Sequence, residues 1–217
     1  MKMAETSLKM VPKLYSNKER RDVKHHIKNL YSSSFGRDFE KYTMYKKKRT
    51  KIKKMGLTFD FKKNDLDLIK KSKETFLLAF LPTDKQLEAG NDNKQEMLKK
   101  EWNETIINVT SLLKDGGKIY IHSIKDGQDV IAFALFYVST DETEIFVDIL
   151  AVNPNYQRMS LGSTLLDSLF FEFPENSLIE LITNRKDNEK ALKFYKKNGF
   201  VTRFELSHNL VLVKKRW

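Results

Sequence analysis

The sequence predicts a mixed α/β (α+β) fold, in which helices flank a largely antiparallel sheet and a basic helical extension comes first. Alternating apolar and polar residues, the pattern of half-buried strands, recur in short segments from residue 57 to the end of the chain. Apolar residues at helical spacing occupy the segments between them. An Asp-Gly pair at Asp126 and Gly127 joins two of the strands, which is a strong signal for an antiparallel hairpin.

The 217 residues suffice for one domain of about 160 residues plus an extension. Residues 1–54 hold 17 Lys and Arg against 5 Asp and Glu, a net charge of +12. The remaining residues hold 23 against 24, a net charge of −1, so the whole positive excess lies in the first quarter. We therefore expect a basic N-terminal extension over 1–54 and a folded domain over 55–217.

Composition excludes several classes of protein. The chain has no cysteine, which rules out thiolate nucleophiles, disulfides and the usual structural zinc sites. Its longest apolar runs, at residues 76–81 and 130–138, are far shorter than the roughly 18 residues of a membrane span, and its N-terminus lacks the apolar core of a signal peptide. We expect a cytoplasmic protein without a membrane span.

The first half of the chain predicts helices around one strand. Residues 18–31 have a weak helical pattern, and a cationic run follows at 45–54. Residues 57–61 alternate like a strand, and Asn64 is a candidate N-cap for a helix that continues to residue 80. After a polar loop at 83–94, a second helix is expected over 95–113, ended by Gly116 and Gly117.

The second half predicts most of the sheet. Strands are expected at 118–124, 129–139 and 144–152, followed by a helix with an apolar face of Leu161, Leu165, Leu166, Leu169, Phe170 and Phe173. The next strand covers 177–183, a short helix capped by Asn188 ends at Gly199, and a hairpin over 200–215 with its turn at His208 and Asn209 closes the chain. The predicted order is β-α-α-β-β-β-α-β-α-β-β.

The stretch VNPNYQRMSLGSTLL, residues 152–166, has the character of an anion-binding loop. A strand ends, a turn forms at Asn153 and Pro154, and a helix with regularly spaced leucines begins after a basic and polar segment. The first N–H groups of such a helix have no intrahelical partner and can receive an anion. Gly162 would let a bulky ligand approach closely, Arg158 adds positive charge, and no carboxylate competes for the amides. Neither common nucleotide-binding signature is present.

Two blocks of the sequence resemble the GCN5-related N-acetyltransferase (GNAT) family. The segment AVNPNYQRMSLGS, residues 151–163, is similar to that family's acyl-CoA loop, although Ser160 replaces the first loop glycine. The segment NEKALKFYKKNGF, residues 188–200, matches a second family element. The resemblance covers roughly residues 57–217. Ser160 either tolerates the required backbone angles and lends a hydroxyl to the pyrophosphate, or weakens the cofactor site.

The resemblance implies acetyl-CoA as the acyl donor and no metal. It implies that pantetheine inserts beside strand 144–152, where it would bind backbone groups of Leu150 and Val152. The amides of the loop would take the pyrophosphate, and two asparagines that enter helices would also touch the cofactor. The resulting cofactor-binding set is Leu150, Val152, Gln157, Arg158, Met159, Ser160, Leu161, Gly162, Ser163, Asn184 and Asn188.

Three residues are candidates for catalysis. Tyr195 occupies the family's general-acid position, although packing beside Phe194 would also explain it. Glu144 and Asp148 lie four apart on one strand and so point to the same face. Asp148 is the preferred base for a protonated acceptor amine, with an exposed or turn-capping carboxylate as the alternative. His122 is interpreted as a structural histidine.

The predicted activity is an acetyl-CoA-dependent N-acetyltransferase, in which a primary amine attacks the thioester directly in a ternary complex. The alternative is a non-catalytic or degenerate protein of this fold that binds nucleic acid or another anionic partner through residues 1–54. The acceptor is an amine on a small molecule or on a protein, and the protein is expected to be a monomer or a homodimer.

Overall fold

A computed structural model describes residues 35–81, 92–139, 143–173, 178–184, 189–207 and 209–215. The chain divides into two compact units, residues 1–44 with Trp217, and Tyr45–Arg216. In the first unit, the described residues form the beginning of helix α3 (Phe35–Lys54). The predicted helix at 18–31, the cap Asn188, the turn residue His208 and most of the predicted loop 83–94 lie outside the described residues.

The second unit contains a sheet of seven strands in the order β1-β2-β3-β4-β5-β7-β6. Every neighbouring pair is antiparallel except β4 and β5, which run parallel. The predicted mixed and largely antiparallel sheet is confirmed. The strands are β1 (Thr58–Lys63), β2 (Ile119–Asp126), β3 (Asp129–Val138), β4 (Glu144–Val152), β5 (Leu178–Asn184), β6 (Val201–Glu205) and β7 (Asn209–Lys215).

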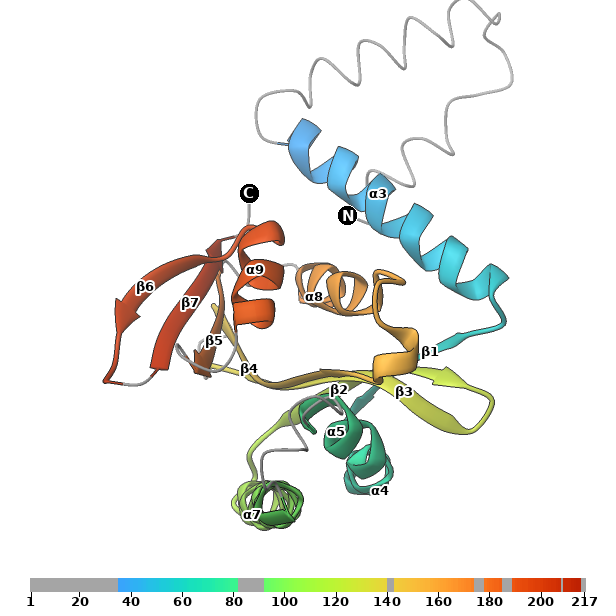
Figure 1. Cartoon of the computed structure of the whole chain (residues 1–217). Helices are drawn as coiled ribbons and strands as arrows, with labels where there is room; N and C mark the ends of the chain where they lie inside the picture. Colours follow the sequence, from blue (N-terminus) through green and yellow to red (C-terminus); the bar gives the residue numbers. More distant parts are fainter. Residues whose placement is uncertain are drawn as a thin grey trace, which may run out of the picture. The chain divides into compact units, whose positions relative to one another are not determined.

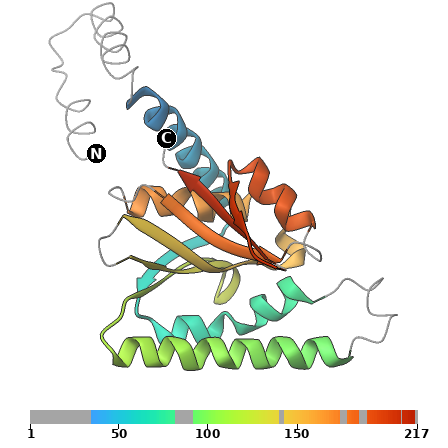
Figure 2. The ribbon, with the colours of Figure 1, turned by 90° about the vertical axis from the view of Figure 1, so that its left-hand side faces the viewer.

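Helices cover both faces of this sheet (Figure 1). On one face lie α4 (Leu66–Lys71), α5 (Lys73–Phe80) and α7 (Asp92–Lys114). On the other lie α8 (Leu161–Glu172) and α9 (Glu189–Lys197), and Figure 2 shows the same two layers from the side. Because helices cover both faces, consecutive residues of β2 and β3 are buried, at Ile119–Ile124 and Val130–Phe136, and neither strand has a face exposed to water there.

Aromatic residues fill the core on the α7 side of the sheet. Trp102 of α7 packs against Phe76 of α5 and Phe133 of β3, with ring centroids 5.0 and 6.2 Å apart. All three side chains are almost fully buried. These contacts hold α5 and α7 against the central strands. Asp148 lies on the face of the sheet that these helices cover.

Two local differences from the predicted helices have clear causes. Asp65, and not Asn64, caps α4, since its side chain accepts a hydrogen bond from the Leu68 N–H at 2.8 Å. Asn64 has a positive φ of 56° and instead accepts from the Ile119 N–H at 3.0 Å. The single predicted helix is divided at Ser72, which ends α4 and begins α5.

The second unit begins at Tyr45, ten residues before the predicted boundary after residue 54. Tyr45 and Ile52 of α3 are only 3% and 1% exposed. Tyr45 stacks on Phe171 of α8 with centroids 4.8 Å apart, and the Lys48 Nζ lies 2.7 Å from Asp167 Oδ2. The cationic run therefore belongs to a helix with one side packed against the folded unit and with exposed lysines on the other.

No helix in the described parts of the chain has both the length and the apolar character that crossing a membrane requires.

Candidate active site

The parallel strands β4 and β5 stay together over only part of their length. Their register runs from Glu144 opposite Leu178 to Val147 opposite Leu181 and ends there. Beyond this point β4 continues to Val152 along β3, and β5 continues to Asn184 along β7. Over residues 148–152, the β4 edge that faces β5 therefore has no strand partner among the described strands.

A β-bulge lies at the same position. Val147 pairs with Phe136 and Ile149 pairs with Leu135, so Asp148 is an extra residue without a partner on β3. Ile149 and Ala151 belong to the core under α4, α5 and α7. By alternation, Leu150 and Val152 point to the opposite face, where α8 and α9 lie.

Asp148 lies on the α7 side of the sheet among other ionisable groups. Its side chain keeps contact with solvent, but partial burial raises the pKa of the Asp148 carboxyl above its ordinary value. Partial burial also raises the pKa of Glu101 on α7, and the neighbouring charge of Asp148 raises it further. The pKa of Tyr137 is likewise raised by burial, and then by Asp148 and Glu180. A carboxylate with a raised pKa is a stronger proton acceptor than an ordinary aspartate, which suits a general base.

Glu144 occupies the other end of the strand. Its backbone N–H donates to Ser139 Oγ at 3.0 Å, and its carbonyl accepts from the Ser139 N–H at 2.9 Å. Four strand residues of about 3.3 Å each separate it from Asp148, so the two Cα atoms lie roughly 13 Å apart along β4. The structure does not bring Glu144 to the point where β4 and β5 part.

The loop after β4 is held by its own polar groups. The Asn153 side chain accepts from the Asn155 N–H at 3.0 Å and caps a short 3₁₀ turn at Pro154–Tyr156. The Tyr156 hydroxyl donates to Asp126 Oδ2 at 2.7 Å, which ties the loop to the β2–β3 hairpin. Gln157 Nε2 lies 3.4 Å from the carbonyl oxygen of Val152.

The residues just before α8 adopt a left-handed backbone. Arg158 and Ser160 have φ values of 63° and 64°, a region that favours glycine. Ser160 is the N-cap of α8, yet its side chain makes no capping hydrogen bond. Its carbonyl accepts the first intrahelical bond, from the Thr164 N–H at 2.9 Å. The N–H groups of Leu161, Gly162 and Ser163 therefore have no intrahelical partner, and no acidic residue lies in this turn.

Gly162 is buried and faces protein. A Cβ at this position would lie 3.1 Å from Phe194 Cζ and 3.5 Å from Val152 Cγ2. The absence of a side chain thus lets α8 approach α9 and the end of β4. Nearby, the exposed Arg158 and the half-buried Met159 complete the loop.

Tyr195 belongs to the α8 and α9 layer, on the opposite side of the sheet from Asp148. Its ring lies between those of Phe194 and Phe200, with centroids 5.3 and 5.5 Å away. Burial raises the pKa of Tyr195 to about 12, so the hydroxyl keeps its proton at neutral pH. Asn184 is half-buried at the end of β5, opposite Asn209 of β7.

His122 takes no part in this site. It is 1% exposed, and its Nδ1 lies 2.5 Å from Ser168 Oγ of α8. Burial, with a smaller contribution from Arg49, lowers the pKa of His122 to about 4. The imidazole is therefore neutral near pH 7 and joins β2 to α8.

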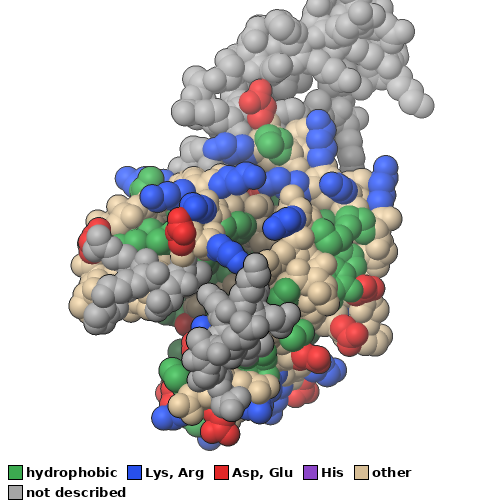
Figure 3. Space-filling model, in the orientation of Figure 1, with side chains coloured by type: hydrophobic (Ala, Val, Ile, Leu, Met, Phe, Trp, Pro, Cys, Tyr) green, Lys and Arg blue, Asp and Glu red, His purple; other side chains and the backbone are tan. Residues whose placement is uncertain are grey.

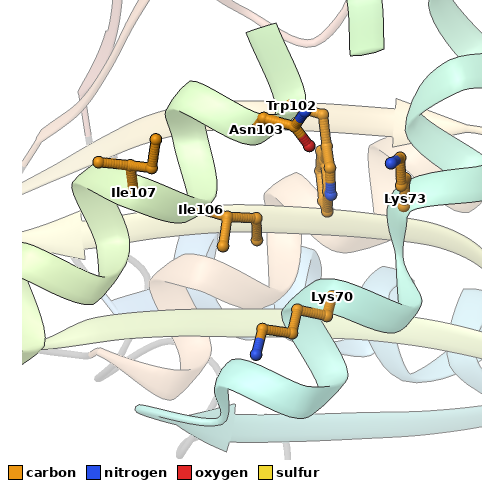
Figure 4. Close-up of a pocket in the computed structure, with 6 residues that line it drawn as sticks. All are labelled: Lys70, Lys73, Trp102, Asn103, Ile106 and Ile107. Atoms are coloured by element: carbon orange, nitrogen blue, oxygen red, sulfur yellow. The ribbon is translucent and has the colours of Figure 1, made fainter. Parts of the chain in front are cut away.

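A separate hollow of about 370 Å³ opens on the outer side of α4, α5 and α7 (Figure 4). Trp102 and Ile106 form its apolar floor, and Lys70 and Lys73 lie at its edge. None of the predicted site residues lines it.

Sequence analysis did not find Glu101, Tyr137 and Glu180 as neighbours of Asp148. They come from α7, β3 and β5, and only the bulge and the parallel pairing bring them together. The one local signal was the charged Glu180 in the middle of an apolar segment, residues 178–182, of β5.

Comparison with known proteins decides the family. Residues 78–200, more than half of the chain, match the family model described as "Acetyltransferase (GNAT) family". The chain belongs to this family. The resemblance predicted from residues 151–163 and 188–200 is confirmed.

Individual relatives are more distant. The chain is 37% identical over 70 residues to the [Ribosomal protein bS18]-alanine N-acetyltransferase of Escherichia coli, covering 32% of this chain and 46% of that protein. The chain thus spans about half the length of the curated relatives it matches. Among solved structures, the PaiA N-acetyltransferase of Thermoplasma acidophilum in complex with coenzyme A has a TM-score of 0.53 at 15% identity, covering 73% of this chain and 99% of that one.

An acetyltransferase from Thermus thermophilus has a TM-score of 0.54 at 14% identity, covering 73% of this chain and 97% of that one. At such identities, these two likenesses show the shared fold.

Proposed function

We propose that this chain of the GNAT family transfers an acetyl group from acetyl-CoA to a primary amine by direct attack in a ternary complex. The observation that carries the proposal is the separation of β4 from β5 after Val147 and Leu181, just ahead of the uncapped start of α8. A strand edge without a partner and a helix N-terminus without a carboxylate supply the two kinds of backbone group that an acyl-CoA needs.

The donor would be held mainly by backbone. Pantetheine contains amide groups and can lie along an open strand edge as an added strand, so Leu150 and Val152 would receive it. The pyrophosphate would lie at the N-terminus of α8, where Leu161, Gly162 and Ser163 offer N–H groups and the helix dipole favours negative charge. Acetyl-CoA would supply the activated thioester.

Asp148 would act as the general base and Tyr195 as the general acid. The raised pKa of Asp148 favours removal of a proton from the ammonium form of the acceptor. Tyr195 keeps its hydroxyl proton and can donate it, or a hydrogen bond, toward the leaving thiolate. Because the chain has no cysteine, an acyl-cysteine intermediate is excluded and direct attack is the simpler route.

The acceptor would approach from the α7 side. The carboxyls of Glu101 and Asp148 lie there, and their negative potential favours an acceptor that arrives as an ammonium ion, whereas Glu180 is already paired with Arg203 at 2.8 Å. An amine of a protein alanine, of the kind named for the Escherichia coli relative, and a small cationic amine both satisfy this condition.

The test is release of free coenzyme A thiol by purified protein, with acetyl-CoA and panels of amines and N-terminal peptides. We expect acceptor-dependent thiol release, together with thermal stabilisation by acetyl-CoA alone. Stabilisation without any turnover would favour a degenerate protein that only binds the cofactor. No stabilisation and no turnover would contradict the proposal.

A further inference from the structure

The outer side of α3 carries a row of lysines. Lys47, Lys51 and Lys54 are exposed and stand at positions i, i+4 and i+7, the spacing that places side chains on one helix face. At 1.5 Å per residue they are about 6 and 4.5 Å apart along the axis. We call these three residues the basic stripe. Figure 3 shows Lys and Arg side chains along α3 on the face that Figure 1 presents.

The opposite side of the helix fixes the stripe to the folded unit. Tyr45 and Ile52 are buried there, and Arg49 lies over the ring of Phe59, 5.1 Å from its centroid. Lys48 binds Asp167, whose second oxygen lies 3.4 Å from the Nζ of the buried Lys214. The stripe is therefore presented outward from a packed helix.

The charge of this segment has no internal balance. Residues 45–54 contain seven Lys and Arg and no Asp or Glu. None of the three stripe lysines forms an ion pair with another described residue. Lysines at i, i+3 and i, i+4 repel each other, and this repulsion destabilises the helix. An anionic partner bound to the stripe would reduce the repulsion.

We propose that the basic stripe docks the phosphate backbone of a nucleic acid. Lysines act as point charges toward phosphates, and such contacts do not depend on base sequence. Thr50, which lies between them, donates its hydroxyl to the Lys46 carbonyl, so the stripe presents only lysine ammonium groups outward.

The composition favours a nucleic acid over the other anionic partners. Lysine is depleted at protein–protein interfaces, whereas arginine and aromatic residues are enriched there. An interfacial membrane helix needs a broad apolar face to insert. Tyr45 and Ile52 are buried in the folded unit, and Met44 and Met55 are the exposed large apolar residues among the described side chains of 40–55, which is too few for such a face. The inference concerns docking alone and does not depend on the proposed acetyl transfer.

The test uses the full chain and a short DNA duplex and RNA duplex of the same sequence, with binding measured by fluorescence anisotropy at several salt concentrations. The wild type should bind both duplexes. The triple variant Lys47→Gln, Lys51→Gln, Lys54→Gln should lower the log–log slope of affinity against salt by about 3, roughly 1 for each lost phosphate contact.

A matched variant removes the same charge from α7, on the other side of the sheet: Lys99→Gln, Lys100→Gln, Lys114→Gln. It should keep the wild-type slope, and thermal unfolding of both variants should match the wild type because all six side chains are exposed. Equal loss in both variants would show an effect of net charge alone and overturn the proposal. Binding to phosphatidylserine vesicles or polyglutamate, with none to either duplex, would also overturn it.

Discussion

Replacing Tyr195 by Phe is the most direct test of the proposed chemistry. The substitution keeps the ring between Phe194 and Phe200 and removes only the hydroxyl. The pKa of Tyr195 is raised to about 12, whereas an ordinary thiol has a pKa of about 8.5. Full proton transfer to the leaving thiolate is thus uphill by about 3.5 pKa units, or roughly 5 kcal/mol. A hydrogen bond to the developing thiolate is the more favourable form of help.

The unfavourable proton transfer from Tyr195 limits the loss of kcat expected for Tyr195→Phe. General acid catalysis contributes about 10²- to 10⁴-fold, and the unfavourable transfer places Tyr195→Phe near the lower end, with kcat reduced about 10²-fold. Affinity for acetyl-CoA should stay close to that of the wild type. Because the pKa is about 12, deprotonation of Tyr195 should cause no fall in wild-type kcat below about pH 10.

The assay is single-turnover thiol release, which reports the chemical step, with Tyr45→Phe as the control. Tyr45 is a second buried tyrosine, on α3, whose hydroxyl lies 3.4 Å from Arg49 and outside the proposed site. Wild-type single-turnover rates in Tyr195→Phe would contradict the general-acid role and show that Tyr195 serves only in packing. A wild-type activity that declines near pH 8 with the ionisation of this tyrosine would refute the assigned pKa.

Three further predictions concern the base, the loop and α3. Asp148→Asn should lower kcat, and the loss should shrink as pH rises in a pH–rate profile, because more acceptor amine is then neutral; a constant loss at all pH values would argue against a base. Ser160→Gly should raise thermal stability by up to about 1 kcal/mol, since glycine adopts a φ of 64° without strain, and should change acetyl-CoA affinity in calorimetry by no more than about 1 kcal/mol. A large gain in affinity would support a weakened cofactor site in the natural protein. Ile52→Ala should destabilise the protein by about 2–5 kcal/mol in denaturant unfolding, whereas Lys51→Gln should change it by less than about 0.5 kcal/mol; equal, small effects would place α3 outside the folded unit.

Most of the fold could be predicted because its signals are local. Strand β4 spans Glu144–Val152 as predicted, and every second residue from Ile145 to Ala151 is buried. The α8 leucines recur at helical spacing, and Leu161, Leu165 and Leu169 are all buried. Gly199, with a φ of 84°, follows α9 where a glycine was expected to end it.

The inner side of α3 could not be predicted from the same rules. Between residues 45 and 54 only Tyr45 and Ile52 are apolar and buried. Two apolar residues among seven Lys and Arg are too few to show the periodicity of an amphipathic helix. Arg49 and Lys48 add to the packing through a ring contact and an ion pair with distant residues, Phe59 and Asp167. Long basic side chains that cover apolar surface look like a solvated run when only the sequence is considered.

For the site, the loop could be predicted and the surroundings of Asp148 could not. Residues 157–163 are contiguous, so their spacing alone predicts an uncapped helix start. The neighbours of Asp148 come from three other elements. They lie close together because of the strand order and the bulge, and neither can be predicted from the local pattern of apolar residues.

The bulge at Asp148 connects these features physically. An extra residue increases the local twist of β4, and β4 loses its pairing with β5 immediately after Val147, at the same step. The bulge also lets Asp148 and Ile149 lie toward the α7 side while Leu150 and Val152 turn toward α8 and α9. The inserted residue thus coincides with the separation of the two strands. In the proposed reaction, the open β4 edge would receive the donor, and Asp148, with its raised pKa, would face the acceptor from the α7 side. In this arrangement the reacting groups would meet through the opening between the strands, with Tyr195 and Asp148 on opposite sides of it.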